Sequence, residues 1–391
     1  MKNKSLTPQI RFKGYDDEWQ QAKVRDVFTL GNGYTPSKAN PAFWTNGTIP
    51  WFRMEDIREN GRVLADSIQH VTPEAVKSSG LFPAGCIIVS TTATIGEHAL
   101  LIADSLANQQ FTVFQTVNRW SWLKAKYLLY RFYGLGDWCR KNVNAGGLAA
   151  VSITDLQKYD IDFPSTAEER DSIADYFDNI DKLLVDTERE ITRLEKMKQA
   201  SLQKMFPRPG ETTPEIRFDG FTEPWKMKSI SQILTIGNGC DYKHLSKGII
   251  PVFGTGGIMT HVSKCLYDGE SVFIGRKGTI DKPLYFNGKF WTVDTLFYTH
   301  SFVDAVPYFV YCLFQKINWQ SYNAATGVPS LSKDVINTIE VTIPLPDEQK
   351  AIANYFRNLD AIISAKRKKL EKLQNLKQSC LDKMFVNTTA Q

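Results

Sequence analysis

Two long stretches of the chain place apolar residues at alternating steps of three and four, the spacing of a helix with one buried face. The first stripe runs from Ile173 to Met205 and stops before Pro207, because proline cannot continue a helix. The second stripe runs from Ile352 to Met384. Each stretch therefore predicts a helix of about 38 residues, or roughly 57 Å at ~1.5 Å per residue.

Polar residues mark the expected start of each helix. Ser165 and Thr166 lie three residues before Glu168 and Glu169, which is the spacing of a capping box. Asp347, which follows two prolines, is the expected N-cap of the second helix.

A stripe of this length must be buried against another surface, and each helix is the simplest partner for the other. Polar residues interrupt both stripes at matching steps, Thr187 with Lys366 and Lys198 with Lys377, and such residues can fix the register of a coiled coil. We predict an antiparallel pair, because each helix must return the chain to the opposite globular unit. The basic run 366–369 is either a solvated helix face or a strip that faces phosphates or another subunit.

The remainder of the chain repeats around these helices. Residues 8–19 return as residues 214–225 with Ile-Arg-Phe and the final Trp kept, at an offset of 206. Residues 173–177, Ile-Ala-Asp-Tyr-Phe, return as Ile-Ala-Asn-Tyr-Phe at 352–356, at the smaller offset of 179. The second body is therefore shorter than the first by the difference between the two offsets. A solenoid needs three or more short, similar repeats, so the pattern instead favours one frame that carries two different bodies.

Short apolar runs bounded by turn residues predict strands within each body. Strands are expected within 81–90, 111–114, 267–275 and 296–299, and aromatic-rich helices at 125–133 and 306–318. The predicted class is an α+β pseudo-twofold repeat with these parts: a globular domain at 1–164, a spacer helix at 165–206, a second globular domain at 207–345, a second spacer helix at 346–386 and a tail at 387–391.

Composition narrows the protein class only a little. With 42% hydrophobic and 23% charged residues, the chain is typical of globular proteins. A net charge of +5 permits a polyanionic partner without requiring one. Six cysteines without a Cys-x-x-Cys pair, beside five histidines, argue against a structural zinc site. We find neither a signal-peptide core nor an apolar run of ~18 residues, and therefore expect a cytoplasmic protein without membrane contact.

Several motifs superficially match catalytic or cofactor-binding sites, but their sequence context does not support that function. Pro346-Asp-Glu-Gln-Lys350 superficially matches a metal-dependent nuclease, but acidic residues at a helix start are explained by the helix dipole. Gly31-Asn-Gly33 and Gly237-Asn-Gly239 lack the third glycine of a dinucleotide-binding loop. The sequence also lacks a phosphate-binding P-loop and the Asn-Pro-Pro-aromatic tetrapeptide of amino-methyltransferases. We predict no catalytic residue, no metal site and no directly bound cofactor.

Loops of the globular domains combine basic, amide and hydroxyl side chains, the groups that contact phosphates and base edges. For any one of them an ordinary polar loop is the alternative. Arg276 and Lys277 are the strongest pair, because they lie between two glycines after a strand, and glycine allows close approach of a partner. The candidate DNA-contacting residues are Tyr34, Lys38, Arg53, Thr92, Arg140, Lys141, Asn144, Lys243, His244, Arg276 and Lys277.

Several motifs occur in a fixed order over roughly residues 8–386. They are Ile10-Arg-Phe12 with Trp19, Gly31-Asn-Gly33 with Thr35-Pro36, Ile49-Pro-Trp51, Gly275-Arg-Lys-Gly278, Pro344-Leu-Pro346 with Glu348-Gln349, and the Ile-Ala-x-Tyr-Phe helix starts. As an ordered set they resemble the specificity subunit of type I restriction-modification systems.

The resemblance implies a non-catalytic subunit whose two globular domains are target-recognition domains for the halves of a split site in double-stranded DNA. It implies that the helices set the spacing and dock two methyltransferase subunits, and we assign this docking to Phe177, Leu194, Phe356 and Leu373. Motor/nuclease subunits would complete the complex, and S-adenosylmethionine, ATP and Mg²⁺ would belong to these partners.

One departure from the family pattern concerns the start of the first helix. Pro164-Ser165 followed by Glu168-Glu169 stands where the family has Pro-Leu-Pro and Glu-Gln, so the first helix is expected to dock its partner differently. Two other functions stay open: a coiled-coil interaction scaffold or inhibitor that reads no DNA, and a free-standing DNA-modifying enzyme, for which no motif is present.

Overall fold

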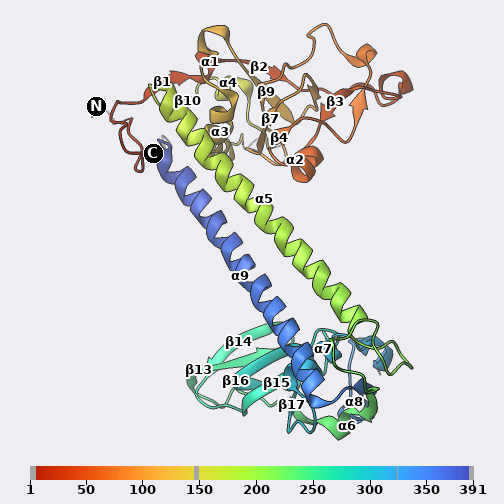
Figure 1. Cartoon of the computed structure of the whole chain (residues 1–391). Coiled ribbons are helices and arrows are strands. Elements are labelled where there is room, and N and C mark those ends of the chain that lie inside the picture. The colour runs from red at the N-terminus through yellow and green to blue at the C-terminus, as the bar shows by residue number, and fades with distance from the viewer. Residues whose placement is uncertain (1–5, 145–148, 324, 387–391) are drawn as a thin grey trace. The chain divides into compact units, whose positions relative to one another are not determined.

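A computed structural model describes residues 6–144, 149–323 and 325–386 of the chain (Figure 1). The chain forms two compact units: unit 1 contains residues 1–186 and 370–391, and unit 2 contains residues 187–369. Each unit holds one globular domain and part of each long helix. We call the described residues up to 164 domain 1 and residues 207–345 domain 2. The predicted tail at 387–391 lies outside the described residues.

Both long helices are present: α5 spans Ala167–Lys204 (38 residues) and α9 spans Pro346–Met384 (39 residues). The predicted N-cap Asp347 is wrong, because α9 already begins at Pro346. The fixed φ of proline suits the first helical position, where its missing N–H has no partner to lose. At the start of α5, Thr166 Oγ1 accepts from the Glu169 N–H at 3.4 Å.

Within each unit the two helices run antiparallel, as predicted. In unit 1 the Tyr176 hydroxyl lies 3.3 Å from Cys380 Sγ, and Asp181 pairs with Lys377, so later residues of α5 meet earlier residues of α9. In unit 2 the same order holds for Lys198 with Asp360 at 2.6 Å and for Ser201 with Tyr355 at 2.9 Å. The basic run 366–369 is partly neutralised inside unit 2, since Lys366 pairs with Glu190 and Arg367 with Glu195.

In each unit a polar residue of the helix stripes takes part in a network of one lysine, one aspartate and one tyrosine, which we call the clasp. In unit 2, Lys198 Nζ binds Asp360 Oδ1 at 2.6 Å, and the Tyr308 hydroxyl of domain 2 donates to Asp360 Oδ2 at 2.8 Å. Burial and this hydrogen bond raise the pKa of Tyr308, so its hydroxyl stays protonated and can donate. Unit 1 repeats the clasp with Lys377, Asp181 and the Tyr130 hydroxyl of domain 1.

Asp360→Asn is expected to destabilise unit 2 by about 1–2 kcal/mol. Hydrogen bonds to charged groups typically contribute somewhat more, about 1.5–3 kcal/mol. The reduction reflects solvent screening, because the Asp360 side chain is 28% exposed. Urea denaturation measures the change, with Glu188→Gln at an exposed position of α5 within unit 2 as the control that removes the same charge. Equal effects of the two variants would show that helix charge, and not the clasp, is responsible.

Domain 1 is built on a twisted sheet in the order β2-β9-β6-β7-β4, with a smaller sheet β5-β3-β8 beside it. Helix α3 packs on the main sheet through β6 and β7, and its aromatic residues fill the core. The elements are β1 (Gln20–Lys23), α1 (Val24–Val27), β2 (Phe28–Asn32), η1 (Pro41–Phe43), β3 (Ile49–Phe52), α2 (Met54–Asn60), β4 (Val63–Leu64), β5 (His70–Val71), η2 (Pro73–Ala75), β6 (Ile87–Ser90), β7 (His98–Leu101), β8 (Leu106–Ala107), β9 (Phe111–Thr116), η3 (Asn118–Trp120), α3 (Ala125–Lys141), α4 (Ile153–Leu156) and β10 (Asp160–Phe163).

Domain 2 has a single main sheet in the order β12-β17-β15-β16-β13-β14, with α7 packed on β15 and β16. The predicted strands and aromatic helices are present in both domains, but the helix predicted at 306–318 is shorter, because α7 ends at Phe314. The elements are β11 (Lys226–Ser229), α6 (Ile230–Ile233), β12 (Thr235–Asn238), β13 (Lys247–Gly254), β14 (Gly257–Val262), β15 (Tyr267–Gly275), β16 (Leu284–Thr292), β17 (Leu296–His300), α7 (Pro307–Phe314), η4 (Trp319–Tyr322), α8 (Lys333–Thr338) and β18 (Glu340–Ile343).

The length difference between the domains lies mainly in one segment. Between Gly33 and β6, domain 1 carries η1, β3, α2, β4, β5 and η2, whereas domain 2 has only the hairpin β13–β14 between Gly239 and β15. The sheet strands on either side of this segment correspond, since β2, β6 and β9 have the order and pairing of β12, β15 and β17. The two domains thus share a frame and differ in an insertion.

The repeated Ile-Arg-Phe…Trp block joins each domain to its helix start. Arg11 binds Glu169 with two hydrogen bonds of 2.6 and 2.8 Å, and Arg217 binds Glu348 with two of 2.7 Å. Both glutamates are almost fully buried. A bidentate guanidinium–carboxylate pair explains why these residue types return at these positions. The tryptophan that ends each block, Trp19 or Trp225, is also buried.

This geometry corrects the departure inferred at the first helix. Glu169, and not Glu168, is the equivalent of Glu348, because each binds the arginine of its own Ile-Arg-Phe block. The next residue is also equivalent: Arg170 Nη1 donates to the Pro164 carbonyl at 2.7 Å, as Gln349 Nε2 donates to the Pro344 carbonyl at 2.9 Å. Arg170 therefore performs at the first helix the backbone contact that Gln349 makes at the second.

Candidate nucleic-acid interface

Loop cluster 2 is formed by the residues that follow β12 and β15 and precede β17 and α8. The sheet register brings these points together, since Asn238 pairs with Phe297 and Gly275 pairs with Leu296. The backbone N–H of Arg276 donates to the Thr295 carbonyl at 2.8 Å. Its own carbonyl accepts from Leu331 at 2.9 Å, and Lys277 forms an isolated bridge with Ser330. Both predicted side chains of this pair are exposed.

Glycines let the chain pass closely in this cluster. The Gly239 N–H donates to Leu296 at 3.0 Å, and a Cβ on Gly239 would lie 2.0 Å from the Val293 carbonyl oxygen. A Cβ on Gly275 would lie 2.0 Å from the Thr279 carbonyl oxygen. No side chain larger than hydrogen fits at either position without a backbone shift.

An open pocket of about 490 Å³ lies beside this cluster. Lys243 lines the pocket together with Asp294 and Thr295, the same turn that Arg276 contacts through Thr295. The structure therefore brings Lys243 and the Arg276–Lys277 pair to one place. His244 is exposed, with its ring 5.9 Å from that of Trp291.

Loop cluster 1 repeats this arrangement in domain 1. The N–H of Thr91, directly after β6, donates to the Gln110 carbonyl at 2.9 Å. The Thr91 carbonyl accepts from Val151 at 3.0 Å, and Thr92 forms an isolated bridge with Ala150. The bridge partner Ala150 also accepts from the Asn144 N–H at 3.0 Å, so two predicted residues, Thr92 and Asn144, meet here.

The loop after β2 closes the cluster as its counterpart does in domain 2. The Gly33 N–H donates to Phe111 at 2.9 Å, and a Cβ on Gly33 would lie 2.0 Å from the Asn108 carbonyl oxygen. The Thr35 hydroxyl donates to the side chain of Gln109, which ties this loop to the turn before β9.

Two predicted side chains are partly engaged inside domain 1. The Tyr34 hydroxyl donates to the Ala75 carbonyl at 3.3 Å and accepts from the Lys77 N–H at 3.0 Å. The Arg53 guanidinium lies 5.5 Å from the ring centre of Trp51, and its side chain is 21% exposed. Both positions support local structure, whereas Lys38 and Lys141 are exposed.

Arg140 lies in a different surrounding from the loop cluster. It pairs with Asp137 and lines a pocket of about 410 Å³ that also includes His98 and Asp382. Burial, with a further contribution from the Arg62 charge, lowers the pKa of His98 to about 3. His98 is therefore neutral at physiological pH.

The assigned docking residues fall into two groups. Phe177 and Phe356 are fully buried and pack against aromatic rings of their own units, so the assignment of these two side chains to a partner surface is wrong. Their helical spacing identified them as apolar positions, but both side chains are part of the domain cores. Leu194 and Leu373 are only half-buried and stay candidates.

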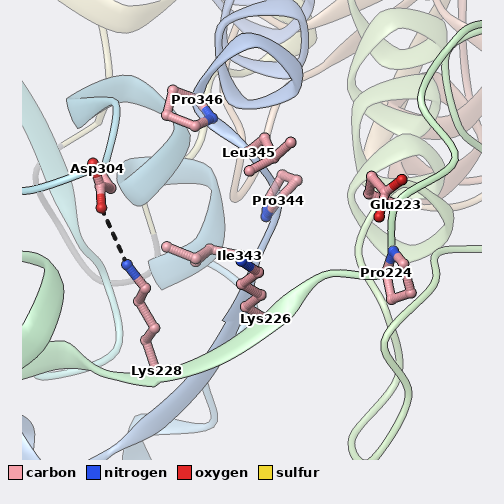
Figure 2. A pocket seen from close by; sticks show the side chains of 9 residues that line it. All are labelled: Glu223, Pro224, Lys226, Lys228, Asp304, Ile343, Pro344, Leu345 and Pro346. Carbon is pink, nitrogen blue, oxygen red and sulfur yellow. Dashed lines mark hydrogen bonds and ion pairs between the residues drawn. The ribbon is translucent and has the colours of Figure 1, made fainter.

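A further pocket of about 400 Å³ opens where β11 and β18 meet the start of α9 (Figure 2). Lys228 and Asp304 form an ion pair of 3.4 Å at one side, and Leu345 is 53% exposed. In domain 1, Ser165 Oγ follows the corresponding strand and donates to the Glu18 carbonyl at 2.7 Å. This pocket belongs to the frame and not to loop cluster 2.

Cys240, which follows Gly239 in loop cluster 2, has an exposed thiol, whereas Cys86, Cys139 and Cys312 are buried. Burial raises the pKa of the Cys86 and Cys139 thiols to about 12 and also raises that of Cys312. In residues 6–144, 149–323 and 325–386, no group of three or more His, Cys, Asp or Glu is placed to hold a metal ion. No helix in the described part of the chain is long and apolar enough to span a membrane.

The list of candidate residues included Thr92 but omitted several members of the loop clusters, among them Thr91, Gln110, Thr295 and Ser330. Strand ends could have identified Thr91, since it follows β6 as Arg276 follows β15. The partners Gln110 and Thr295 contribute backbone carbonyls. Every residue type has a backbone carbonyl, so the sequence does not identify these partners.

Comparisons with known proteins agree with this architecture. The family model described as Type I restriction modification DNA specificity domain matches residues 16–196 and again 222–375. The EcoprrI specificity subunit of a type I restriction enzyme from Escherichia coli is 30% identical over 383 residues, covering 94% of this chain and 92% of that protein. The MjaIX specificity subunit from Methanocaldococcus jannaschii is 23% identical, covering 85% of each chain. In fold, the chain is similar to the S subunit of a type I restriction-modification system from M. genitalium, with a TM-score of 0.67, 15% identity, and coverage of 98% of this chain and 100% of that one.

Proposed function

Because this chain belongs to the family of type I restriction-modification specificity subunits, we propose that each globular domain reads one half of a bipartite target in double-stranded DNA. A specificity subunit is a non-catalytic component that gives the restriction-modification complex its DNA sequence specificity. Loop clusters 1 and 2 are the reading surfaces. The observation that carries this proposal is the occurrence of one backbone-held cluster in both domains with different side chains on each.

The chemistry of loop cluster 2 suits a polyanion. Arg276, Lys277 and Lys243 are exposed on neighbouring turns, and lysine and arginine supply the phosphate contacts that dominate DNA affinity. Arginine can also bind the major-groove edge of guanine with two hydrogen bonds. Loop cluster 1 has the hydroxyl and amide groups of Thr92 and Asn144 at its bridge, which suits a different set of base edges.

The long helices are the surface proposed for protein partners. Docking of two methyltransferase subunits, with motor/nuclease subunits completing the complex, would use side chains that the chain itself leaves uncovered. Apolar residues that are close to half exposed lie on both helices, beside the half-buried Leu194 and Leu373. We assign S-adenosylmethionine, ATP and Mg²⁺ to those partners. The exposed apolar residues are Leu183, Val185, Met197, Ile362 and Leu376.

Footprinting of the complex with its methyltransferase subunits tests the reading function. Two protected half-sites separated by an unread gap are expected, because two separate loop clusters contact the duplex. A single contiguous footprint, or protection that does not depend on sequence, would contradict a bipartite reader.

Arg276→Ala/Lys277→Ala is expected to weaken DNA binding about tenfold or more and to reduce the slope of log affinity against log salt by about 1–2. Each lost phosphate contact removes about 0.9 from that slope, and a lost base contact removes about 1–3 kcal/mol of discrimination. Binding of the complex at several salt concentrations measures both quantities.

The matched control is Lys264→Ala/Lys289→Ala, which removes two exposed charges near the opposite end of β15, where Lys289 of β16 lies opposite Asp268 in the strand register. The control should leave the affinity and the salt slope nearly unchanged. If both double variants behave alike, the effect comes from net charge; if neither changes binding, domain 2 serves as an interaction scaffold.

A further inference from the structure

The two loop clusters hold one dipeptide in the same backbone position. Thr91 and Arg276 are each the first residue after a strand, and each joins the turn before the neighbouring strand to the loop before a short helix. Thr92 and Lys277, the residues that follow, each form an isolated antiparallel bridge to that second loop. The loop then enters α4 or α8, which begin in both domains with a serine N-cap. Thr91–Thr92 and Arg276–Lys277 are therefore structural equivalents, although the repeat is not readable here in the sequence.

Backbone groups make all of these bonds. The amide and carbonyl of the first residue and the bridge of the second hold the dipeptide whatever side chains it carries. The backbone bonds therefore permit side-chain exchange at the second residue, Thr92 or Lys277, which is not fully buried, without loss of the local fold. Such a position is suited to vary with the target while its geometry stays constant.

The side chains that occupy the position differ in reach and in charge. Thr91 is 7% exposed, and its hydroxyl lies 3.3 Å from Thr112 Oγ1, so it is directed into domain 1. Thr92 is half-buried and uncharged. Arg276 and Lys277 are both exposed and place two positive charges at the same point of domain 2.

We propose that Thr91–Thr92 and Arg276–Lys277 are the equivalent target-determining positions of the two domains. Arg276–Lys277 gives domain 2 cationic contacts to guanine edges and phosphates that domain 1 does not make at its own dipeptide. This inference rests on the proposed DNA-reading function. It adds which residues make the two domains recognise different half-sites. The two domains consequently differ in the salt dependence of their half-site binding.

Exchange of the dipeptides tests the proposal in the full chain assembled with its methyltransferase subunits. The half-sites are first read from the methylated sequences of the host genome, and duplexes with one scrambled half-site are then compared with the intact target over a range of salt. Arg276→Thr/Lys277→Thr should reduce discrimination of half-site 2 about tenfold or more, leave discrimination of half-site 1 unchanged and lower the salt slope by about 1–2. Thr92→Lys should change discrimination only at half-site 1 and raise the slope by about 0.9.

The salt slope distinguishes the two kinds of contact. Discrimination of half-site 2 that falls with an unchanged slope assigns the pair to base edges. A lower slope with unchanged discrimination would limit the pair to phosphate contacts and would overturn its role in determining the target. Equal losses at both half-sites, or an unchanged affinity, discrimination and slope in both exchange variants, would overturn the equivalence. The outcome is separable from failure of the proposed function, in which the unsubstituted complex would not distinguish the intact target from either scrambled duplex.

Discussion

Gly239→Ala is expected to abolish recognition of one half-site while the other half-site is still read. A Cβ at this position would lie 2.0 Å from the Val293 carbonyl oxygen and 2.6 Å from the Val293 carbonyl carbon, and the backbone cannot yield there without moving the turn before β17. That turn carries the Thr295 carbonyl, which holds Arg276 in place. Discrimination at half-site 2 should fall at least as far as in the Arg276→Ala/Lys277→Ala variant.

Gly256→Ala is the matched control in the same domain. A Cβ at Gly256 would meet no heavy atom within 4 Å, and its backbone is not in the left-handed region that favours glycine. Binding of the complex to targets with one scrambled half-site measures both variants. Discrimination at half-site 2 that survives Gly239→Ala would show that loop cluster 2 is not the reading surface of domain 2.

Arg131→Met is expected to lower the free energy of unfolding of unit 1 by about 3–5 kcal/mol, the usual cost of removing one partner from a buried ion pair. Arg131 on α3 and Asp162 on β10 form an ion pair in which both side chains are at most 1% exposed. Arg131 Nε also donates to the Asp162 carbonyl at 3.2 Å, and Nη1 donates to the Tyr159 hydroxyl at 3.2 Å. The substitution leaves the Asp162 carboxylate buried without its counter-charge.

Burial raises the pKa of Asp162, while the Arg131 charge acts in the opposite direction. Removal of Arg131 should therefore raise this pKa further and favour the protonated carboxyl. Unit 1 of the variant should regain part of its stability as the pH falls towards the acid range, because protonation removes the buried charge. Urea denaturation at several pH values measures this recovery.

Arg140→Met provides the comparison on the same helix, since Arg140 pairs with Asp137 where both side chains are about half exposed. Its effect should stay within about 0.5 kcal/mol, as is usual for surface substitutions. The double variant Arg131→Met/Asp162→Asn should recover part of the loss, because no unpaired charge remains buried. A small effect of Arg131→Met, similar to that of Arg140→Met, would contradict the buried-pair interpretation.

The long helices and the twofold frame could be predicted from the sequence, because the signals that reveal them lie within short segments of the chain. A long stripe repeats its apolar spacing many times, so Ile173, Ile180 and Ile191 report one buried face without knowledge of the partner. The same stripe could not separate helix–helix contacts from domain contacts. Phe177 and Phe356 follow the spacing, yet both belong to domain cores. The ring of Tyr130 on α3 stacks on Phe177, and the ring of Phe206, which follows α5, contacts Phe356.

Candidate reading residues were accessible only as residue types in loops. Arg276 and Lys277 could be selected because two glycines flank them, which is a local signal. Thr91 also follows a predicted strand, but its equivalence to Arg276 comes from bonds to Gln110 and Val151, which are brought near by the sheet. Arg53 and Tyr34 had suitable chemistry, but contacts inside domain 1 engage them.

The sequence by itself determined the twofold frame: two helices, two domains, and the repeated Ile-Arg-Phe and tryptophan residues that begin each half. These features follow from periodic spacing and from repeated motifs, which are local properties of the chain. Only the tertiary structure decided that Glu169 and Glu348 bind Arg11 and Arg217, and that Thr91–Thr92 is the counterpart of Arg276–Lys277. The reason is physical, because long-range pairing brings these groups together. The equivalence of the two dipeptides in addition rests on backbone carbonyls, and a backbone carbonyl is the same in every residue.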